Sequence, residues 1–312
     1  MGQRPNSDKP ISRAEIREIE EKANQGKAHY QNEYGMMLVL GNYVPEDIEK
    51  AVEYFRKAAA QDHPEAIWNY ACYLMKDPRG PLDKDKGLEV LTLACEKGIP
   101  YILNQLGYMY LHGIDVKRDE EKGQELLRRG ADAGSPNAQF NLGTFYALKQ
   151  DEELDALAFE LVEKAAKADL SDAICVLGVF YIKGLGCEQD VDKGLELINL
   201  AVDQDNGIAM VVLGEFYESG EFFEQDYALA RHYFGKAVSL GKLRAYAPMA
   251  KLLWKGLGGP KDLDAAFPLY QAALLGGISG IYQEYHAFMT EYAKSLEEAG
   301  RPLPDVSGRF ST

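Results

Sequence analysis

The chain has 312 residues, of which 46% are hydrophobic and 27% are charged, a composition that is ordinary for a globular protein. A formal net charge of −15 argues against a nucleic-acid binder, because such proteins gather Lys and Arg on one face. No apolar run is long enough to span a membrane, and the first thirty residues lack the apolar core of a signal peptide. We therefore expect a cytoplasmic protein with neither a nucleic acid nor a membrane as its partner.

The first predicted element is a helix over residues 12–25, which follows a polar, disordered tail over residues 1–11. Ser12 is followed three residues later by Glu15, the spacing at which two side chains cap a helix N-terminus reciprocally. The helix falls in the register of the second helix of a repeat that would precede the first complete one. We therefore expect it to cap the N-terminal end of a stack of repeats.

A repeat of about 36 residues then occupies about residues 28–278. A small residue follows an apolar one at steps of 36, 36, 36, 35, 36 and 36, and these small residues are Gly35, Ala71, Gly107, Gly143, Gly178, Gly214 and Ala250. Self-similarity at this period is the signature of a solenoid. The chain is therefore predicted to be all-α, an α/α superhelical solenoid of about seven helix–turn–helix repeats between residues 12 and 298.

Each repeat contains the pattern of two helices. In the first helix, apolar or small residues lie on one face, as at Ala138, Leu142, Gly143 and Tyr146. The small residue fits a point where two helices cross closely. Twelve residues later an Asp can accept hydrogen bonds from the free N–H groups that begin the second helix. These predicted caps are Asp47, Asp83, Asp119, Asp155, Asp190, Asp226 and Asp262.

The last predicted helix covers residues 279–298 and is followed by a flexible tail over residues 299–312. The next small position of the repeat would fall at residue 286, which is His286. A large polar residue there fits a helix that caps the C-terminal end, because terminal repeats have no further unit to pack on.

These repeats resemble the Sel1-like repeat family, a relative of the tetratricopeptide repeat. The resemblance extends over about residues 22–282 and is clear in residues 173–205 and 209–241. The residues that match there include Leu177, Gly178, Tyr181, Gly184, Asp190, Leu213, Gly214, Tyr217, Gly220 and Asp226. The resemblance implies a scaffold or adaptor that holds a protein, although a fold does not by itself establish a function.

A curved stack of helix pairs offers a concave face lined by the first helix of each repeat. Positions two residues before and five residues after the small residue should escape burial there. Two aromatic residues one position earlier are candidate anchors, because aromatic side chains dominate interface energetics. The candidate partner-binding groove is Trp68, Asn69, Lys76, Gln105, His112, Phe140, Asn141 and Lys183.

The histidine, cysteine and aspartate residues are not spaced as they are in a catalytic or metal-binding motif. The five His do not pair at a spacing of three or four, and the four Cys form no CxxC pair. The recurring Asp lie one repeat apart, too far for paired-carboxylate catalysis. We therefore expect no catalytic residue, metal, cofactor or small-molecule substrate.

Three functions remain open. The first is a scaffold or adaptor that binds a partner protein or peptide on the concave face. The second is a bacterial inhibitor or immunity-type protein that blocks a toxin or an enzyme. The third is an enzyme, which would need a pocket with convergent titratable groups. A secreted, disulfide-stapled branch of the family is disfavoured, because a regular Cys pair in each repeat is absent.

Overall fold

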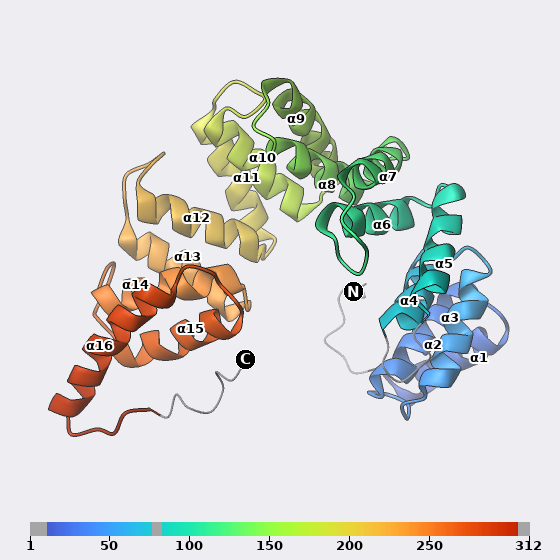
Figure 1. Ribbon diagram of the computed structural model, residues 1–312, viewed down its shortest axis with the longest axis horizontal. Helices are drawn as coiled ribbons and strands as arrows, with labels where there is room; N and C mark the ends of the chain where they lie inside the picture. The colour runs from blue at the N-terminus through green and yellow to red at the C-terminus, as the bar shows by residue number, and fades with distance from the viewer. Residues whose placement is uncertain (1–10, 77–82, 305–312) are drawn as a thin grey trace. The chain divides into compact units, whose positions relative to one another are not determined.

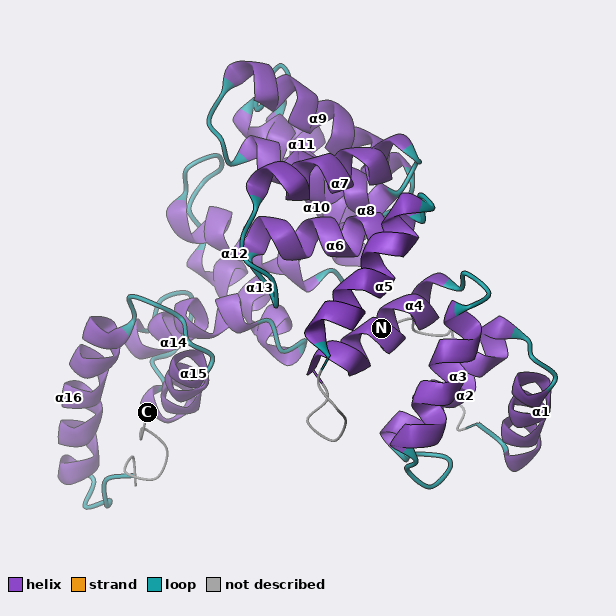
Figure 2. Cartoon of the chain, turned by 45° about the vertical axis from the view of Figure 1, so that its right-hand side comes forward, coloured by secondary structure: helices purple, strands orange, loops and turns teal. Residues whose placement is uncertain are grey.

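A computed structural model describes residues 11–76 and 83–304 of the chain. The chain forms two compact units, residues 1–168 and 169–312, which we describe separately. The described residues form sixteen α-helices and one short 3-10 helix, with no strand (Figures 1 and 2). The prediction of an all-α repeat solenoid is confirmed. Most of the tail predicted at 1–11, and residues 305–312 of the tail predicted at 299–312, lie outside the described residues.

The first unit contains a single helix followed by four helix pairs. They are α1 (Arg13–Asn24), then α2 (Ala28–Leu40) with α3 (Ile48–Ala59), α4 (Pro64–Lys76) with α5 (Lys84–Glu96), α6 (Pro100–His112) with α7 (Glu120–Asp132), and α8 (Pro136–Ala147) with α9 (Glu152–Lys167). We call the first helix of each pair the A helix and the second the B helix. Each A helix packs on the B helix of its own pair.

The second unit contains three pairs and a final single helix. They are α10 (Ser171–Lys183) with α11 (Val191–Asp203), α12 (Gly207–Ser219) with α13 (Tyr227–Ser239), α14 (Tyr246–Lys255) with α15 (Leu263–Leu275), and then α16 (Tyr282–Glu298). The 3-10 helix, Leu243–Ala245, leads into α14. Across the described parts of both units the predicted seven pairs are therefore present.

The B helices begin at side-chain caps, as the sequence predicts for six of seven repeats. The carboxylate of Asp190, for example, accepts from the backbone N–H of Lys193 at 3.0 Å. The predicted cap Asp155 is wrong. Asp151 caps α9 instead, accepting from the N–H groups of Glu153 and Leu154, and Asp155 lies within the first turn. The loop before α9 is shorter than its counterparts, so the helix begins earlier.

The small residue of each repeat lies where the A and B helices cross. A Cβ atom added to Gly178 would stand 2.6 Å from the carbonyl oxygen of Gly194, and one added to Gly194 would stand 2.5 Å from the carbonyl oxygen of Gly178. The backbones of α10 and α11 are thus in direct contact. At Gly214 the ring of Phe234 fills this space instead, 2.6 Å from where a Cβ would lie.

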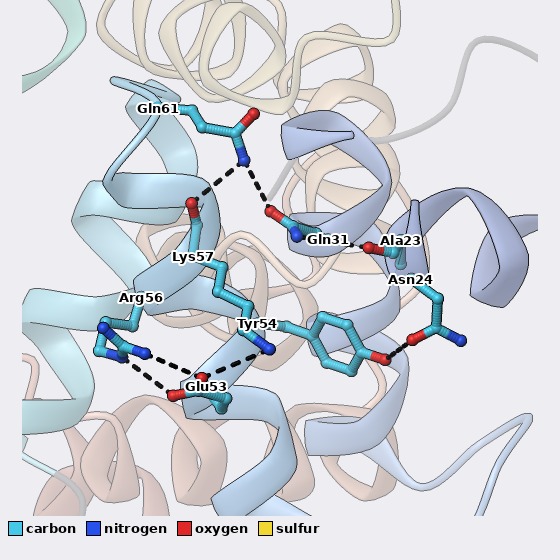
Figure 3. Close-up of polar contacts among 8 residues, drawn as sticks. All are labelled: Ala23, Asn24, Gln31, Glu53, Tyr54, Arg56, Lys57 and Gln61. Carbon is cyan, nitrogen blue, oxygen red and sulfur yellow. Dashed lines mark hydrogen bonds and ion pairs between the residues drawn. The ribbon is translucent and has the colours of Figure 1, made fainter. Parts of the chain in front are cut away.

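The N-terminal helix α1 is fixed to the first repeat by polar contacts (Figure 3). The side chain of Gln31 is only 3% exposed; it donates to the carbonyl of Ala23 at 3.3 Å and accepts from Gln61 at 2.9 Å. The hydroxyl of Tyr54 donates to Asn24 at 2.6 Å. The predicted capping box between Ser12 and Glu15 is present. These contacts satisfy the side-chain amide of Gln31 and the hydroxyl of Tyr54, two polar groups that belong to buried residues of the first repeat.

The C-terminal helix α16 begins at Tyr282 and buries Phe288 against Trp254 and Tyr270. His286 is exposed, as a capping position requires. Beyond the helix, the guanidinium of Arg301 makes two hydrogen bonds to Asp264, at 2.8 and 3.1 Å. The structure thus places an ion pair within the segment predicted as a tail from residue 299.

The four cysteines are free thiols, and two of them, Cys95 and Cys175, are buried. Burial raises the pKa of Cys175 to about 12, with a smaller contribution from Asp172. At pH 8 this thiol should hold on the order of a thousandfold less reactive thiolate than an ordinary cysteine. We expect iodoacetamide, followed by peptide mass spectrometry, to leave Cys175 unmodified in the folded protein. Labelling in urea is the control, and equal labelling rates in both states would contradict the buried position.

Candidate partner-binding surface

The side chains on one side of each A helix form the candidate surface, which we call the A-helix face. It comprises the residues six and two positions before the small residue, and one and five positions after it. This spacing places the four residues on one side of a helix. In α4, α6 and α8 they are Glu65, Asn69, Cys72 and Lys76; Tyr101, Gln105, Tyr108 and His112; and Asn137, Asn141, Thr144 and Leu148. Within the first unit α6 contacts both α4 and α8, so these rows lie side by side.

The structure brings seven of the eight predicted groove residues into the first unit, on or next to this face. Lys76 and His112 are exposed, whereas Trp68, Asn69, Gln105, Phe140 and Asn141 are half-buried. The eighth, Lys183, is exposed at the end of α10 and belongs to the second unit. The predicted groove residues of the first unit therefore lie on or directly beside the A-helix face, and Lys183 is a separate candidate.

The amides of the A-helix face join neighbouring A helices. Asn69 on α4 donates to the side-chain oxygen of Asn32 on α2 at 2.9 Å. Asn141 on α8 donates in the same way to Asn104 on α6 at 2.8 Å, and Asn104 donates to Gln105 at 3.0 Å. In the part of the chain that the structure describes, Asn69 and Asn141 use only their donors in these contacts. Their carbonyl oxygens remain able to accept from a partner.

The two predicted aromatic anchors are half-buried. Trp68 packs against the core cluster formed by α4, α5 and α6, which includes Leu91 and Ile102. The predicted groove did not include a third aromatic residue, which lies on α6. There the ring of Tyr108 is 40% exposed and stands 4.2 Å from the ring of His112, centroid to centroid. Tyr108 lies one position after the small residue, where helical spacing alone identifies it as part of the A-helix face.

The charges on this face are largely paired. The ammonium group of Lys76 lies 2.5 Å from the carboxylate of Asp115, in the loop after α6. Burial raises the pKa of Tyr101, with smaller contributions from Glu65 and Cys72. The face is therefore mostly neutral and rich in hydrogen-bonding groups, which suits recognition of a polypeptide more than of a small charged ligand.

Elsewhere the described residues offer little chemistry. Among residues 11–76 and 83–304, no three His, Cys, Asp or Glu side chains gather in a way that could hold a metal ion. None of the described helices is both long and apolar enough to cross a membrane. A shallow pocket between α3, α4 and α5 is lined by Tyr70 and Leu93 and by the ion pair of Lys97 with Asp62.

Comparison with known proteins agrees with the repeat. The Sel1 repeat family matches residues 28–63, 101–135, 136–170, 171–206, 207–242 and 244–277. A Sel1 repeat protein from Oxalobacter formigenes is 24% identical over 88% of this chain and 80% of its own, with a TM-score of 0.61. An immunity protein from Pseudomonas aeruginosa is 22% identical over 69% of this chain and 85% of its own, with a TM-score of 0.49. The first of these likenesses shows a shared fold.

Proposed function

Because the chain belongs to the Sel1 repeat family, we propose that it is a scaffold or adaptor that binds a partner protein or peptide on the A-helix face of α4, α6 and α8. The observation that supports this most directly is the row of half-buried amides, Asn69, Gln105 and Asn141, beside the exposed rings of Tyr108 and His112. Amides can donate to and accept from a peptide backbone, and aromatic side chains supply contact area at low entropic cost. The partner is a protein rather than a nucleic acid, a membrane or a small-molecule substrate.

The cytoplasm is the compartment that we propose for this interaction. The four cysteines are unpaired, and disulfides persist mainly in oxidising compartments. The proposed binding needs no cofactor.

The test begins by identifying a partner, through affinity capture and mass spectrometry, and then measures binding to the purified partner by calorimetry. The variant replaces Trp68, Asn69 and Asn141 together with Ala. We expect at least tenfold weaker binding, because truncated aromatic anchors and interface amides commonly cost about 1 kcal/mol or more each. Helical content, measured by circular dichroism, should change little.

A matched control is available because each of these hydrogen bonds joins two asparagines, and either one can be replaced. Replacing Asn32 and Asn104 with Ala removes the same two inter-helix hydrogen bonds from their other side. If Asn69 and Asn141 act by touching the partner, this control should bind nearly as well as the wild type. Equal losses in both variants would show that the amides only align the helices, and would overturn their assigned role.

The narrower hypothesis of an inhibitor or immunity-type protein stays a prediction. It requires a stable stoichiometric complex with the product of a neighbouring gene and a loss of that product's activity in the complex. A complex that leaves the partner active supports the scaffold instead. A turnover that depends on side chains of the A-helix face would overturn the binding proposal altogether.

A further inference from the structure

Four repeats have a tyrosine three residues after the small residue. In three of these repeats, a lysine or arginine side chain of the chain itself contacts that tyrosine. The ammonium of Lys122 lies 2.8 Å from the hydroxyl of Tyr110 and 4.2 Å from its ring centroid. Lys193 lies 2.7 Å from the hydroxyl of Tyr181 and 4.0 Å from its ring centroid. The guanidinium of Arg128 donates to the hydroxyl of Tyr146 at 3.3 Å. Each of these tyrosines thus has a cationic partner within the chain.

Tyr217, the fourth of these tyrosines, differs. Lys122 and Lys193 each lie twelve residues after their tyrosine, and the residue twelve after Tyr217 is Leu229, which is 37% exposed. Among the described residues no cation meets the ring of Tyr217, and its hydroxyl makes no hydrogen bond. In two other repeats a lysine ammonium group lies over the ring of the equivalent tyrosine. The repeat of Tyr217 has a leucine in place of that lysine.

Two further rings stand beside that of Tyr217 on α12, one from the loop that follows α12 and one from α13. The ring of Phe223 lies 5.3 Å away, and the ring of Tyr233 lies 5.9 Å away and nearly parallel, at an interplanar angle of 4°. All three side chains are half-buried. We call Tyr217, Phe223 and Tyr233 the aromatic cluster. The faces of aromatic rings attract cations through their quadrupoles, and several rings together do so most strongly.

The segments that form the aromatic cluster carry more carboxylates than cations. Glu221 and Glu224 are exposed in the same loop as Phe223, and neither forms an ion pair within the described residues. Burial raises the pKa of Tyr233, with smaller contributions from Tyr217 and from the carboxylate of Asp203. Residues 169–312 contain twelve Lys and Arg against twenty Asp and Glu. The local charge therefore favours the approach of a cation.

We propose that the aromatic cluster binds a lysine or arginine side chain of the partner protein, which occupies the place that Lys122 and Lys193 fill in their own repeats. This inference rests on the proposed function, since it assumes a protein partner. It specifies the chemistry of that partner as a basic segment, and it adds a contact point in the second unit.

The test introduces a lysine into the chain itself, at the position from which its ammonium group can reach the aromatic cluster. In the variant Leu229→Lys, the new ammonium should take the position that Lys193 takes against Tyr181, and should compete with an external cation. The control Leu275→Lys adds the same charge to an exposed position on α15, where the leucine is 57% exposed. The probe is a fluorescein-labelled peptide of alternating lysine and glycine, whose binding is followed by fluorescence anisotropy at physiological salt.

We expect the probe to bind Leu229→Lys about twofold to fivefold more weakly than Leu275→Lys, the range that one exposed cation–π contact supports. Tyr217→Leu, which keeps the charge of the wild type, should lose a similar factor. Equal affinities for the two lysine variants would overturn the inference, because general charge would then explain the binding. A different result would overturn the proposed function: the protein would form no complex with any partner protein, although the probe peptide still binds.

Discussion

Replacing Gly178 with Leu should lower the free energy of unfolding by about 3 kcal/mol or more, at the upper end of what overpacking a core costs. The new side chain would start 2.6 Å from the carbonyl oxygen of Gly194, 2.7 Å from Ile198 and 3.2 Å from the backbone nitrogen of Ile198. Two of these neighbours are backbone atoms, which cannot move aside as a side chain can. The two helices must therefore separate, and the midpoint of urea unfolding, followed by circular dichroism, should fall sharply.

Gly235 provides the matched control. It also lies inside a helix, α13, but the nearest atom to an added Cβ is the end of Met249 at 3.9 Å. Gly235→Ala should leave stability unchanged or raise it by up to about 1 kcal/mol, because Ala is the better helix former. A loss below about 1 kcal/mol in Gly178→Leu would contradict the close crossing of α10 and α11.

The fold could be predicted because the repeats use the same kinds of residue at equivalent positions: a small residue at the helix crossing and an Asp at the start of the B helix. The spacing of Gly143, Gly178 and Gly214 predicts the pairing of helices, since a small residue at a regular step identifies the crossing point. The family match leaves out the segment that forms α4 and α5, whereas the spacing through Ala71 includes it. Internal repetition thus identified a repeat that the family comparison missed.

The cap of α9 shows where spacing alone fails. The six confirmed caps lie twelve residues after their small residue, but Asp151 lies eight after Gly143. The segment from the small residue to the cap is thus four residues shorter, whereas α9 has 16 residues and α7 has 13, so the repeat as a whole is only one residue short. A count along the sequence detects the net change of one, and cannot detect two compensating changes in loop and helix length.

The candidate surface was predictable in part for the same reason. Helical spacing identified which side of α4, α6 and α8 escapes complete burial, and so selected Asn69 and Asn141. It did not identify Asn32 and Asn104 as their partners, because those hydrogen bonds depend on how far one A helix is offset along the next. The sequence showed that Tyr217 matches the repeat pattern. Only the contacts of Lys122 with Tyr110 and of Lys193 with Tyr181 show that the repeat of Tyr217 lacks an equivalent lysine.

A second large effect is expected at Phe234, which fills the space over Gly214. Its side chain is fully buried, and Phe234→Ala should cost about 3–5 kcal/mol through lost burial and the cavity left behind. Gly214→Ala alone should cost about 1–3 kcal/mol, because its new Cβ would lie 2.6 Å from the ring. Urea unfolding of both single variants and of the double variant measures the coupling between the two positions.

The two losses should not add. Once Phe234 is truncated, the methyl group of Gly214→Ala enters vacated space, and Ala favours the helix over Gly. The double variant should therefore be more stable than the sum of the single losses predicts, by about 1 kcal/mol or more. Phe234→Ala combined with Gly178→Ala is the control, since Gly178 contacts Gly194 and Ile198 instead, and these losses should add. Additivity in the Gly214 pair as well would mean that the ring does not fill the crossing, and that the small residue of this repeat has another role.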